Sequence, residues 1–281
     1  MKGKKIKNTT NLDRHYVAFA FLMICAVIML FPFVWMILSS FKTTMDVYQY
    51  PPRWIPSVWN GDNYAKVFEM IPFLRYYWNS ILTTVVMTAL QIGISILAAY
   101  SLVHLRWPGQ GIMAAIMRSS MFVPMVVTMI PMYLLVSSLG LVDTYAGIIL
   151  PQITTAFTTF LLMSYFASIP QDMIDAAKLD GCGPFRIMTR VVIPNTKGAI
   201  ATASMFSFLG NWKSYTWPLI ITNDKMYRTL PIGLRYLQQE SSMEYQVMMA
   251  AAVMTILPVL IVFVFFEKQL VRSITLTGMK S

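Results

Sequence analysis

The sequence is poor in charged residues and in cysteine. Only 12% of the 281 residues are Asp, Glu, Lys or Arg, against roughly 25% in an ordinary soluble domain, while 57% are hydrophobic. The two cysteines, Cys25 and Cys182, lie in a predicted membrane span and in a connecting segment, so no disulfide framework is expected. The composition therefore predicts an integral membrane protein.

Several motifs that define other functional classes are missing. No G-x-x-x-x-G-K-[ST] phosphate loop occurs, so ATP must be bound by a partner, and we expect no cofactor on this chain. The predicted spans hold no carboxylate for ion coupling, which disfavours a secondary transporter. They hold no cluster of nucleophile, base or metal ligands either, so neither a membrane enzyme nor a metal site is expected. The net charge of +10 is attributed to topology and anionic lipid, not to nucleic acid.

Long runs without a charged residue predict the secondary structure. A bilayer core about 30 Å thick needs about 20 apolar residues per helix, whereas barrel strands are short and alternate in polarity. We expect an all-α protein with a membrane domain at 16–268, preceded by an N-terminal segment at 1–15 and followed by a tail at 269–281. Its six spans are expected at about 16–40, 76–104, 111–138, 144–168, 198–222 and 245–267. Pro32, Pro124, Pro131 and Pro258 are expected to kink their spans.

The distribution of Lys and Arg predicts the orientation, because these residues concentrate on the cytoplasmic side of membrane proteins. Both ends of the chain, the loop at Arg106 and the segment between the fourth and fifth spans together carry 13 cations and five anions. The connecting segments on the other side carry seven of each. We therefore expect both termini in the cytoplasm. The outer segment 42–75 is rich in Trp, Tyr and Pro, which is typical of an interfacial anchor, and docking of an external partner is the alternative.

The cytoplasmic segment 169–196 has the pattern of two short helices. Pro170 suits a first helical turn, and Asp172 favours a helix N-terminus through the helix dipole. Gly181 and Gly183 are expected to end that helix. A second helix is then expected to begin at Pro184 and to end at Pro194.

The first of these helices has a face of small residues. Met173, Ala176 and Ala177 would give a close-packing surface that fits a groove on another protein. The alternative is a connector with a structural role alone.

The same segment resembles the signature of permease subunits of ATP-binding cassette importers. That signature runs Glu-Ala-Ala, three residues, Gly, nine residues, Ile-x-Leu-Pro. This chain has Asp175-Ala176-Ala177, then Gly181, then Val191-Val192-Ile193-Pro194 at the same spacing. It departs from the signature at Asp175, whose carboxylate is one methylene shorter than the usual Glu.

Nearly the whole chain is similar to the second permease of the maltose-type carbohydrate uptake group. The matching segments are Trp35–Lys42, Trp54-Ile-Pro, Asn79-Ser80, Pro124, Pro131-Met-Tyr133, Leu139–Thr144, Trp217-Pro-Leu219, Thr229–Leu234 and Leu276–Lys280. The resemblance implies a type I importer permease fold in the inner or plasma membrane of a prokaryote. It also implies saccharide import by ATP-driven alternating access.

The resemblance implies partners and coupling residues as well. Such a subunit works with a homologous second permease, two cytoplasmic ATP-binding subunits that hold ATP and Mg, and an extracytoplasmic solute-binding protein. The residues implied in coupling to the ATPase are Asp175, Ala176, Ala177, Asp180, Gly181 and Pro194, with Gly278 and Lys280 in the tail as further candidates. A solvated tail without such a contact is the alternative. A permease of the same class for another solute, such as glycerol phosphate, stays open.

A cation inside the fifth span points to the substrate path. Lys213 lies where the maltose-type group usually has Asn, and a charge within a span is costly enough to suggest a function. With Asn211, Trp212, Tyr215 and Trp217, it would offer hydrogen bonds, aromatic faces and a positive charge to an anionic saccharide. Pairing with an acid on the partner permease, or snorkelling, is the alternative. For Arg118, in the third span, snorkelling is expected.

Overall fold

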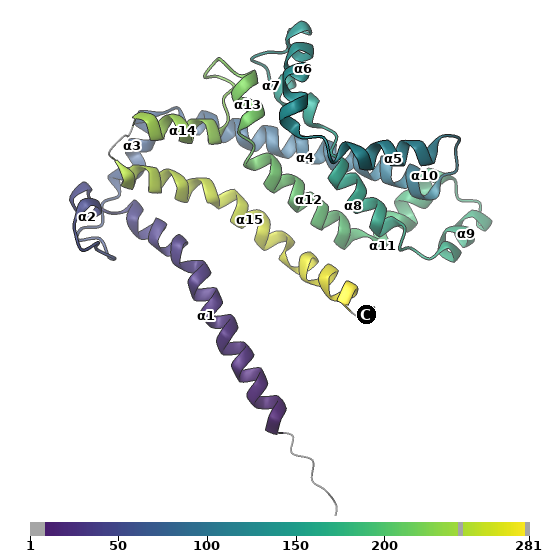
Figure 1. Ribbon diagram of the computed structural model, residues 1–281, viewed down its shortest axis with the longest axis horizontal. Helices are drawn as coiled ribbons and strands as arrows, with labels where there is room; N and C mark the ends of the chain where they lie inside the picture. The colour runs from purple at the N-terminus through teal and green to yellow at the C-terminus, as the bar shows by residue number, and fades with distance from the viewer. Residues whose placement is uncertain (1–8, 241–243, 279–281) are drawn as a thin grey trace, which may run out of the picture. The chain divides into compact units, whose positions relative to one another are not determined.

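The computed structural model is helical throughout the residues that it describes. It describes residues 9–240 and 244–278, with side chains for 16–239 and 244–269, and every regular element in these ranges is a helix (Figure 1). The expected all-α class is thereby confirmed. The larger helices are α1 (Thr9–Ser40), α3 (Asp62–Met70), α4 (Phe73–His104), α5 (Gln110–Ser120), α6 (Met125–Ser138), α8 (Ala156–Phe166), α9 (Gln171–Leu179), α12 (Lys197–Trp212), α14 (Leu230–Glu240) and α15 (Tyr245–Gly278). The short elements are α2 (Thr44–Tyr48), α7 (Tyr145–Ile149), η1 (Leu150–Gln152), α10 (Pro184–Ile187), η2 (Met188–Val192), α11 (Ile193–Asn195) and α13 (Thr216–Ile221).

The chain divides into two compact units. The first comprises Met1–Ile71 and Leu237–Met254, and the second comprises Pro72–Tyr236 and Thr255–Ser281. Helices α14 and α15 therefore contribute residues to both units.

Three helices are long and apolar enough to cross a membrane by length and composition. They contain Tyr16–Ser40, Phe73–His104 and Tyr245–Gln269, close to the expected ranges 16–40, 76–104 and 245–267. Up to five spans result if each of two bent helix pairs is counted as one. Helix α15 runs on to Gly278, so the expected tail is helical over most of its length.

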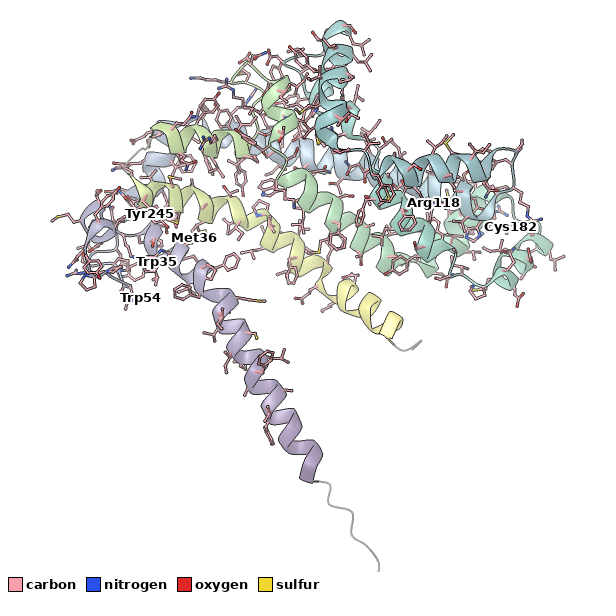
Figure 2. All side chains as sticks on the ribbon, in the orientation of Figure 1. Trp35, Met36, Trp54, Arg118, Cys182 and Tyr245 are labelled. Atoms are coloured by element: carbon pink, nitrogen blue, oxygen red, sulfur yellow. The ribbon has the colours of Figure 1, made fainter. Side chains whose placement is uncertain are left out.

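The first unit includes α1 and the segment that follows it. The most apolar window of α1 has none of its residues buried, as expected of a helix with lipid around it. At its end, the ammonium group of Lys42 lies 3.7 Å from the ring centroid of Trp35, and the side chain is only 2% exposed. Burial lowers the pKa of Lys42. Trp54 packs edge-on against Trp35 at a centroid distance of 5.2 Å (Figure 2).

A buried carboxylate fixes the segment after α1. Asp46 accepts hydrogen bonds from the Ser57 hydroxyl at 2.7 Å and from the Ser57 amide at 3.1 Å, and it forms a capping box with Thr43. Burial alone would raise the pKa of Asp46, but these hydrogen bonds outweigh it and lower the pKa. Arg53 lies 3.6 Å away as an ion-pair partner. The aromatic segment after α1 is therefore a folded structure and not an open loop.

The second unit is built around α4. Helices α8 and α12 pack along α4 (Figure 1). Short polar side chains join the three helices. Thr159 donates to Ser95 at 2.9 Å, and the hydroxyls of Thr158 and Ser207 are 3.1 Å apart. Hydrogen bonds between helices satisfy polar groups that lipid cannot satisfy.

Three of the expected spans are interrupted. The range 111–138 forms α5 and α6, which meet at 105°, because Pro124 has no N–H to continue the first helix and becomes the N-cap of the second. The range 144–168 forms α7, η1 and α8 with a bend of 43°. The range 198–222 is divided at Lys213 between α12 and α13. Pro32, Pro131 and Pro258 lie inside continuous helices.

A buried amide holds the loop before α14. Asn79 is fully buried and donates to the backbone carbonyls of Met226 and Arg228 at 2.8 and 2.9 Å. Its own carbonyl accepts a hydrogen bond of 2.7 Å from the Tyr145 hydroxyl. Ser80 also accepts a hydrogen bond of 2.7 Å from the amide of Leu230. Asn79 and Ser80 together therefore hold the backbone before and at the start of α14.

The first turn of α7 contains Gly147, where another backbone segment lies too close for any residue but glycine. A Cβ on Gly147 would overlap the carbonyl group of Leu141, and Gly147 also accepts a hydrogen bond of 3.2 Å from the buried indole of Trp217. A Cβ on Gly93 in α4, by contrast, would meet nothing within 4 Å.

Gly147→Ala is therefore expected to destabilise the protein by about 1–3 kcal/mol, the usual cost of overpacking. Thermal unfolding of the detergent-purified protein should show a lower midpoint for Gly147→Ala and a nearly unchanged one for Gly93→Ala. Equal midpoints for the two variants would contradict the backbone contact.

Candidate functional site

The segment 169–196 forms a helical hairpin that begins as the sequence predicts. Pro170 is the N-cap of α9, and Asp172 lies in its first turn. Asp175 accepts hydrogen bonds from Lys178 at 2.9 Å and from Gln171 at 3.1 Å. These two contacts, that of Lys178 first, lower the pKa of the Asp175 carboxyl, which is therefore ionised at neutral pH.

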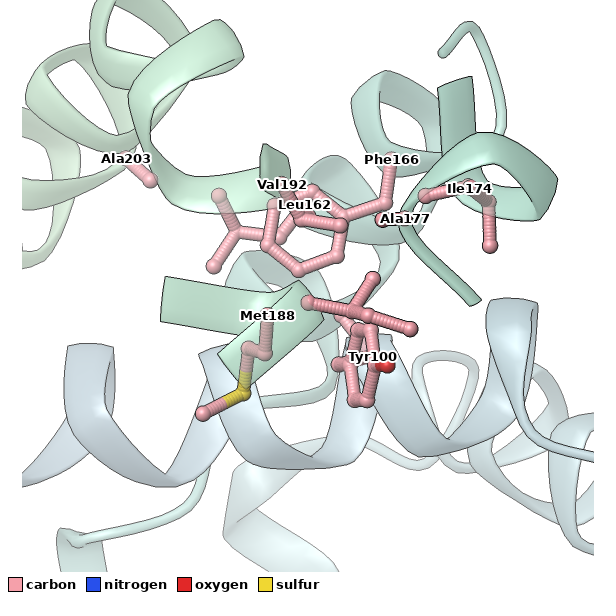
Figure 3. Packing of buried hydrophobic residues seen from close by; sticks show 10 residues of the cluster. Tyr100, Leu162, Phe166, Ile174, Ala177, Met188, Val192 and Ala203 are labelled. Carbon is pink, nitrogen blue, oxygen red and sulfur yellow. The ribbon is translucent and has the colours of Figure 1, made fainter. Parts of the chain in front are cut away.

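One side of α9 is buried against the membrane helices of the second unit. Ile174 and Ala177 belong to a hydrophobic cluster with Leu162 and Phe166 of α8 and Tyr100 of α4 (Figure 3). The cluster is completed by Ala99, Ile187, Met188, Val192 and Ala203. Leu162 and Phe166 have no exposed surface, and α9 joins α8 and α4 in this shared cluster.

The predicted small-residue face of α9 is only partly an outer surface. Ala176 and Met173 are exposed, but Ala177 is 8% exposed and lies in the hydrophobic cluster. A contact of Ala177 with a partner stays a prediction, and within this chain its side chain packs in the cluster. Helical spacing places Ile174 and Ala177 on one face and Ala176 on another.

The outer surface of the hairpin carries large apolar side chains. Leu179 is 90% exposed and Phe185 is 71% exposed, and exposed Asp180 lies between them in the chain. Two large apolar side chains this exposed on one short hairpin fit a surface that another protein covers. Sequence reasoning did not single out Leu179 or Phe185. Their position just beyond the small residues of α9 was the available signal.

The turn between the helices of the hairpin needs a glycine. Gly181 has a φ of +75°, and Cys182 donates its amide to the carbonyl of Ala177 at 3.0 Å, which closes the end of α9. This is the left-handed ending that the sequence predicts for Gly181.

The second helix of the hairpin ends later than expected. Helix α10 continues through the π-helical turns of η2 into α11, which contains Pro194 and ends at Asn195. Pro194 has no N–H to donate, and the widened turns before it accommodate that loss. Of the two tail candidates, Gly278 is the last residue of α15, and Lys280 lies outside the described residues.

Two of the predicted substrate-path residues belong to the core. Trp212 is 6% exposed and packs edge-on against Tyr77, at a centroid distance of 5.9 Å, and in parallel with Phe208. Trp217 is buried and donates to the carbonyl of Gly147. Both indoles have little exposed surface within this chain, and their place along a substrate path stays a prediction. An indole suits a core and a binding site equally, and sequence alone cannot separate the two.

The side chain of Asn211 is occupied by hydrogen bonds between helices. Its amide donates to the side-chain carbonyl of Gln91 at 3.0 Å and to the Thr88 hydroxyl at 3.1 Å, and its own carbonyl accepts from Gln91 at 3.3 Å. Gln91 also donates to the backbone carbonyl of Gln152 at 2.6 Å. Asn211 therefore ties α12 to α4. Gln91 was missed, although a Gln within an apolar run is the kind of signal that marks such a contact.

The remaining two candidates lie at the break between α12 and α13. Lys213 follows the last residue of α12 and is exposed, and Tyr215 is half-buried. No carboxylate in the described part of the chain pairs with Lys213. Within the described residues, no group of three or more His, Cys, Asp and Glu side chains could hold a metal ion.

The turn at Gly181 gives a graded test of backbone geometry. Gly181→Ala forces an alanine into a left-handed conformation, which costs roughly 1–2 kcal/mol. Gly181→Asn should lose less despite its larger side chain, because Asn tolerates that conformation and no atom lies within 4 Å of the added Cβ. Thermal unfolding midpoints in the order glycine, asparagine, alanine are expected. An asparagine variant less stable than the alanine variant would indicate a side-chain clash instead.

Comparisons with known proteins agree with this architecture. The family model described as "Binding-protein-dependent transport system inner membrane component" matches residues 91–276. The arabinooligosaccharides transport system permease protein AraQ of Bacillus subtilis is 31% identical over 263 residues, covering 92% of this chain and 94% of its own length. The sn-glycerol-3-phosphate transport system permease protein UgpE of Brucella abortus is 28% identical, covering 95% and 97%.

A solved structure shows the same fold. The crystal structure of a bacterial ABC transporter involved in the import of the acidic polysaccharide alginate contains a chain that matches with a TM-score of 0.79 and 26% identity. The match covers 94% of this chain and 99% of that chain. The protein has the type I importer permease fold and belongs to the family of binding-protein-dependent transport system inner membrane components.

Proposed function

We propose that this chain is the permease subunit of an ATP-binding cassette importer that carries a saccharide into the cell by alternating access. The family supports the transport role, and the AraQ protein and the alginate transporter support a carbohydrate as the solute. Several apolar helices support a multi-pass protein of the bacterial inner membrane. Transport of glycerol phosphate is the second candidate, favoured by the similarity to UgpE.

The proposed topology has six spans and both termini in the cytoplasm. The three long helices and the two bent pairs would supply five spans, and α12 with α13 would supply the sixth. The excess of Lys and Arg on the side of the α9 hairpin supports its cytoplasmic position. On that side, an ATP-binding subunit could reach it.

The main support for this proposal is that α9 is buried on one side and exposed on the other. Ile174 is buried among the membrane helices, while Leu179 and Phe185 stand exposed on the same hairpin. We expect these two side chains to enter a groove of the ATP-binding subunit, with Ala176 allowing close approach and Asp175 and Asp180 forming polar contacts at the rim. Gly181 and Pro194 would set the shape of the hairpin, and Gly278 and Lys280 would make a second contact with the ATP-binding subunits.

Other exposed faces support further partners. The apolar side chains of Val126, Ile130 and Leu134 on α6 are all exposed, as expected of a surface that faces lipid or a homologous second permease. The family description itself names a binding protein as part of the system. Since the sequence contains no phosphate loop, two separate subunits would bind ATP with Mg.

Extraction of the tagged chain in mild detergent should test the assembly. We expect a second permease and two ATP-binding subunits to co-purify, and ATP hydrolysis to rise when a saccharide-loaded binding protein is added. Phe185→Ser should lower the recovery of the ATP-binding subunits about tenfold, because the complex loses an aromatic side chain that the ATP-binding subunit would bury. Met226→Ser, which changes another exposed apolar residue in a loop on the proposed outer side, is the matched control.

Two results would count against the proposal. A chain that purifies alone and shows no dependence on nucleotide would exclude the importer. A complex whose ATP hydrolysis responds to a binding protein loaded with glycerol 3-phosphate, and not to one loaded with any saccharide, would replace the saccharide by the second candidate.

A further inference from the structure

Three residues on α12 form an exposed stripe in the second unit. Phe206, Gly210 and Lys213 recur at the i, i+4, i+7 spacing of one helix face, and all three are exposed. Neighbouring positions Ala203 and Ser207 are buried against the other helices. With a rise of 1.5 Å per residue, the stripe is about 10 Å long.

An aromatic pair lies at one end of the stripe. Phe206 and Phe157 of α8 meet edge to face with their ring centroids 6.1 Å apart. Phe206 is 52% exposed and Phe157 is 50% exposed, so half of this pair is open to a ligand. Flat apolar ring faces of this kind can pack against the apolar faces of sugar rings.

The middle of the stripe is open. A Cβ added at Gly210 would meet no atom within 4 Å. Beside the bulky Phe206 and the long Lys213, Gly210 therefore leaves space along the helix.

The other end of the stripe is a break in the helix. Helix α12 ends at Trp212 and α13 begins at Thr216. In the connection, Lys213 still donates its amide to the carbonyl of Leu209 at 3.3 Å, whereas Ser214 donates to Asn211 three residues back at 3.1 Å, so the regular helical pattern ends after Lys213. Irregular backbone at membrane depth is tolerated only where it is buried in protein or lines a water-filled cavity. Lys213 and Thr216 are exposed here, so within this chain the break faces outward.

A positive charge at this position needs a counter-charge or water. Lys213 also lies at the C-terminal end of α12, where a cation is favoured by the helix dipole. That local effect accounts for a charge at the break. It does not account for the exposed aromatic pair and the open glycine in line with it.

We propose that the stripe Phe206–Gly210–Lys213 lines the translocation path and that the Lys213 ammonium selects a saccharide that carries carboxylates. This inference rests on the proposed function. A sugar ring would lie on the pair of Phe157 and Phe206, the chain would pass over Gly210, and a carboxylate would meet Lys213. Transport along a path of this kind requires only weak and repeated contacts, which one ammonium and one aromatic pair provide.

The test uses the complete transporter with its binding protein in proteoliposomes. Uptake of a galacturonic acid trisaccharide is compared with uptake of the uncharged galactose trisaccharide. Lys213→Met should lower uptake of the charged sugar about tenfold or more, the usual cost of losing a contact with a charged group, and change uptake of the neutral sugar less than twofold. Lys213→Arg should retain the preference, and Arg118→Met, which removes another cation from an apolar stretch, should leave both uptakes unchanged.

Different outcomes would overturn the anionic selectivity and the proposed function. Equal losses of both sugars in Lys213→Met, no loss of either, or uptake of the neutral sugar alone by the unaltered transporter would each overturn the anionic selectivity and leave saccharide import intact. Uptake of neither sugar, with ATP hydrolysis stimulated by glycerol 3-phosphate instead, would overturn the proposed function.

A second variant tests the position of the stripe independently of charge. Gly210→Leu places a bulky side chain in open space, so assembly of the complex should be unchanged while uptake of both trisaccharides falls about tenfold. Full uptake by this variant, with normal assembly, would show that the stripe does not line the path.

Discussion

The hydrophobic cluster that joins α9 to α8 and α4 connects the exposed side of the hairpin to the membrane helices. Phe166 and Leu162 are completely buried, and Ile174 of α9 is buried beside them (Figure 3). Each such side chain gains about 1.5–3 kcal/mol from burial, so α9 cannot swing away from α8 without opening a costly cavity. A force applied to the exposed side of the hairpin is therefore passed to α8 and the helices that it contacts.

Helix α12 extends this connection toward the proposed path. On one face, Ser207 pairs with Thr158 and Asn211 exchanges hydrogen bonds with Gln91, which fixes α12 to α8 and α4. On the neighbouring face, the stripe Phe206–Gly210–Lys213 stays exposed. One rigid helix thus carries both the contacts that hold it and the surface proposed to meet the solute, so a shift of α8 would move that surface too.

The sequence predicts the elements well where a local rule applies. Proline and glycine signals placed both ends of α9, and apolar length indicated α1, α4 and α15. It predicts poorly what depends on a distant neighbour. The burial of Ala177, Trp212 and Trp217 is set by packing partners that the local pattern does not name. The sequence draws attention to Lys213 because a charge in an apolar run is noticed without its partner, and the same signal was present at Gln91. Phe206, by contrast, acquires meaning only beside Phe157.

We infer that packing at Phe166 couples the hairpin to the membrane helices. The most direct measurement is the number of saccharide molecules imported per ATP hydrolysed by the reconstituted transporter carrying Phe166→Leu, with Phe122→Leu at a highly exposed position as the control. We expect Phe166→Leu to lower this ratio while ATP hydrolysis continues, and the control to keep the ratio of the unaltered protein. An unchanged ratio in an assembled Phe166→Leu transporter would contradict this coupling.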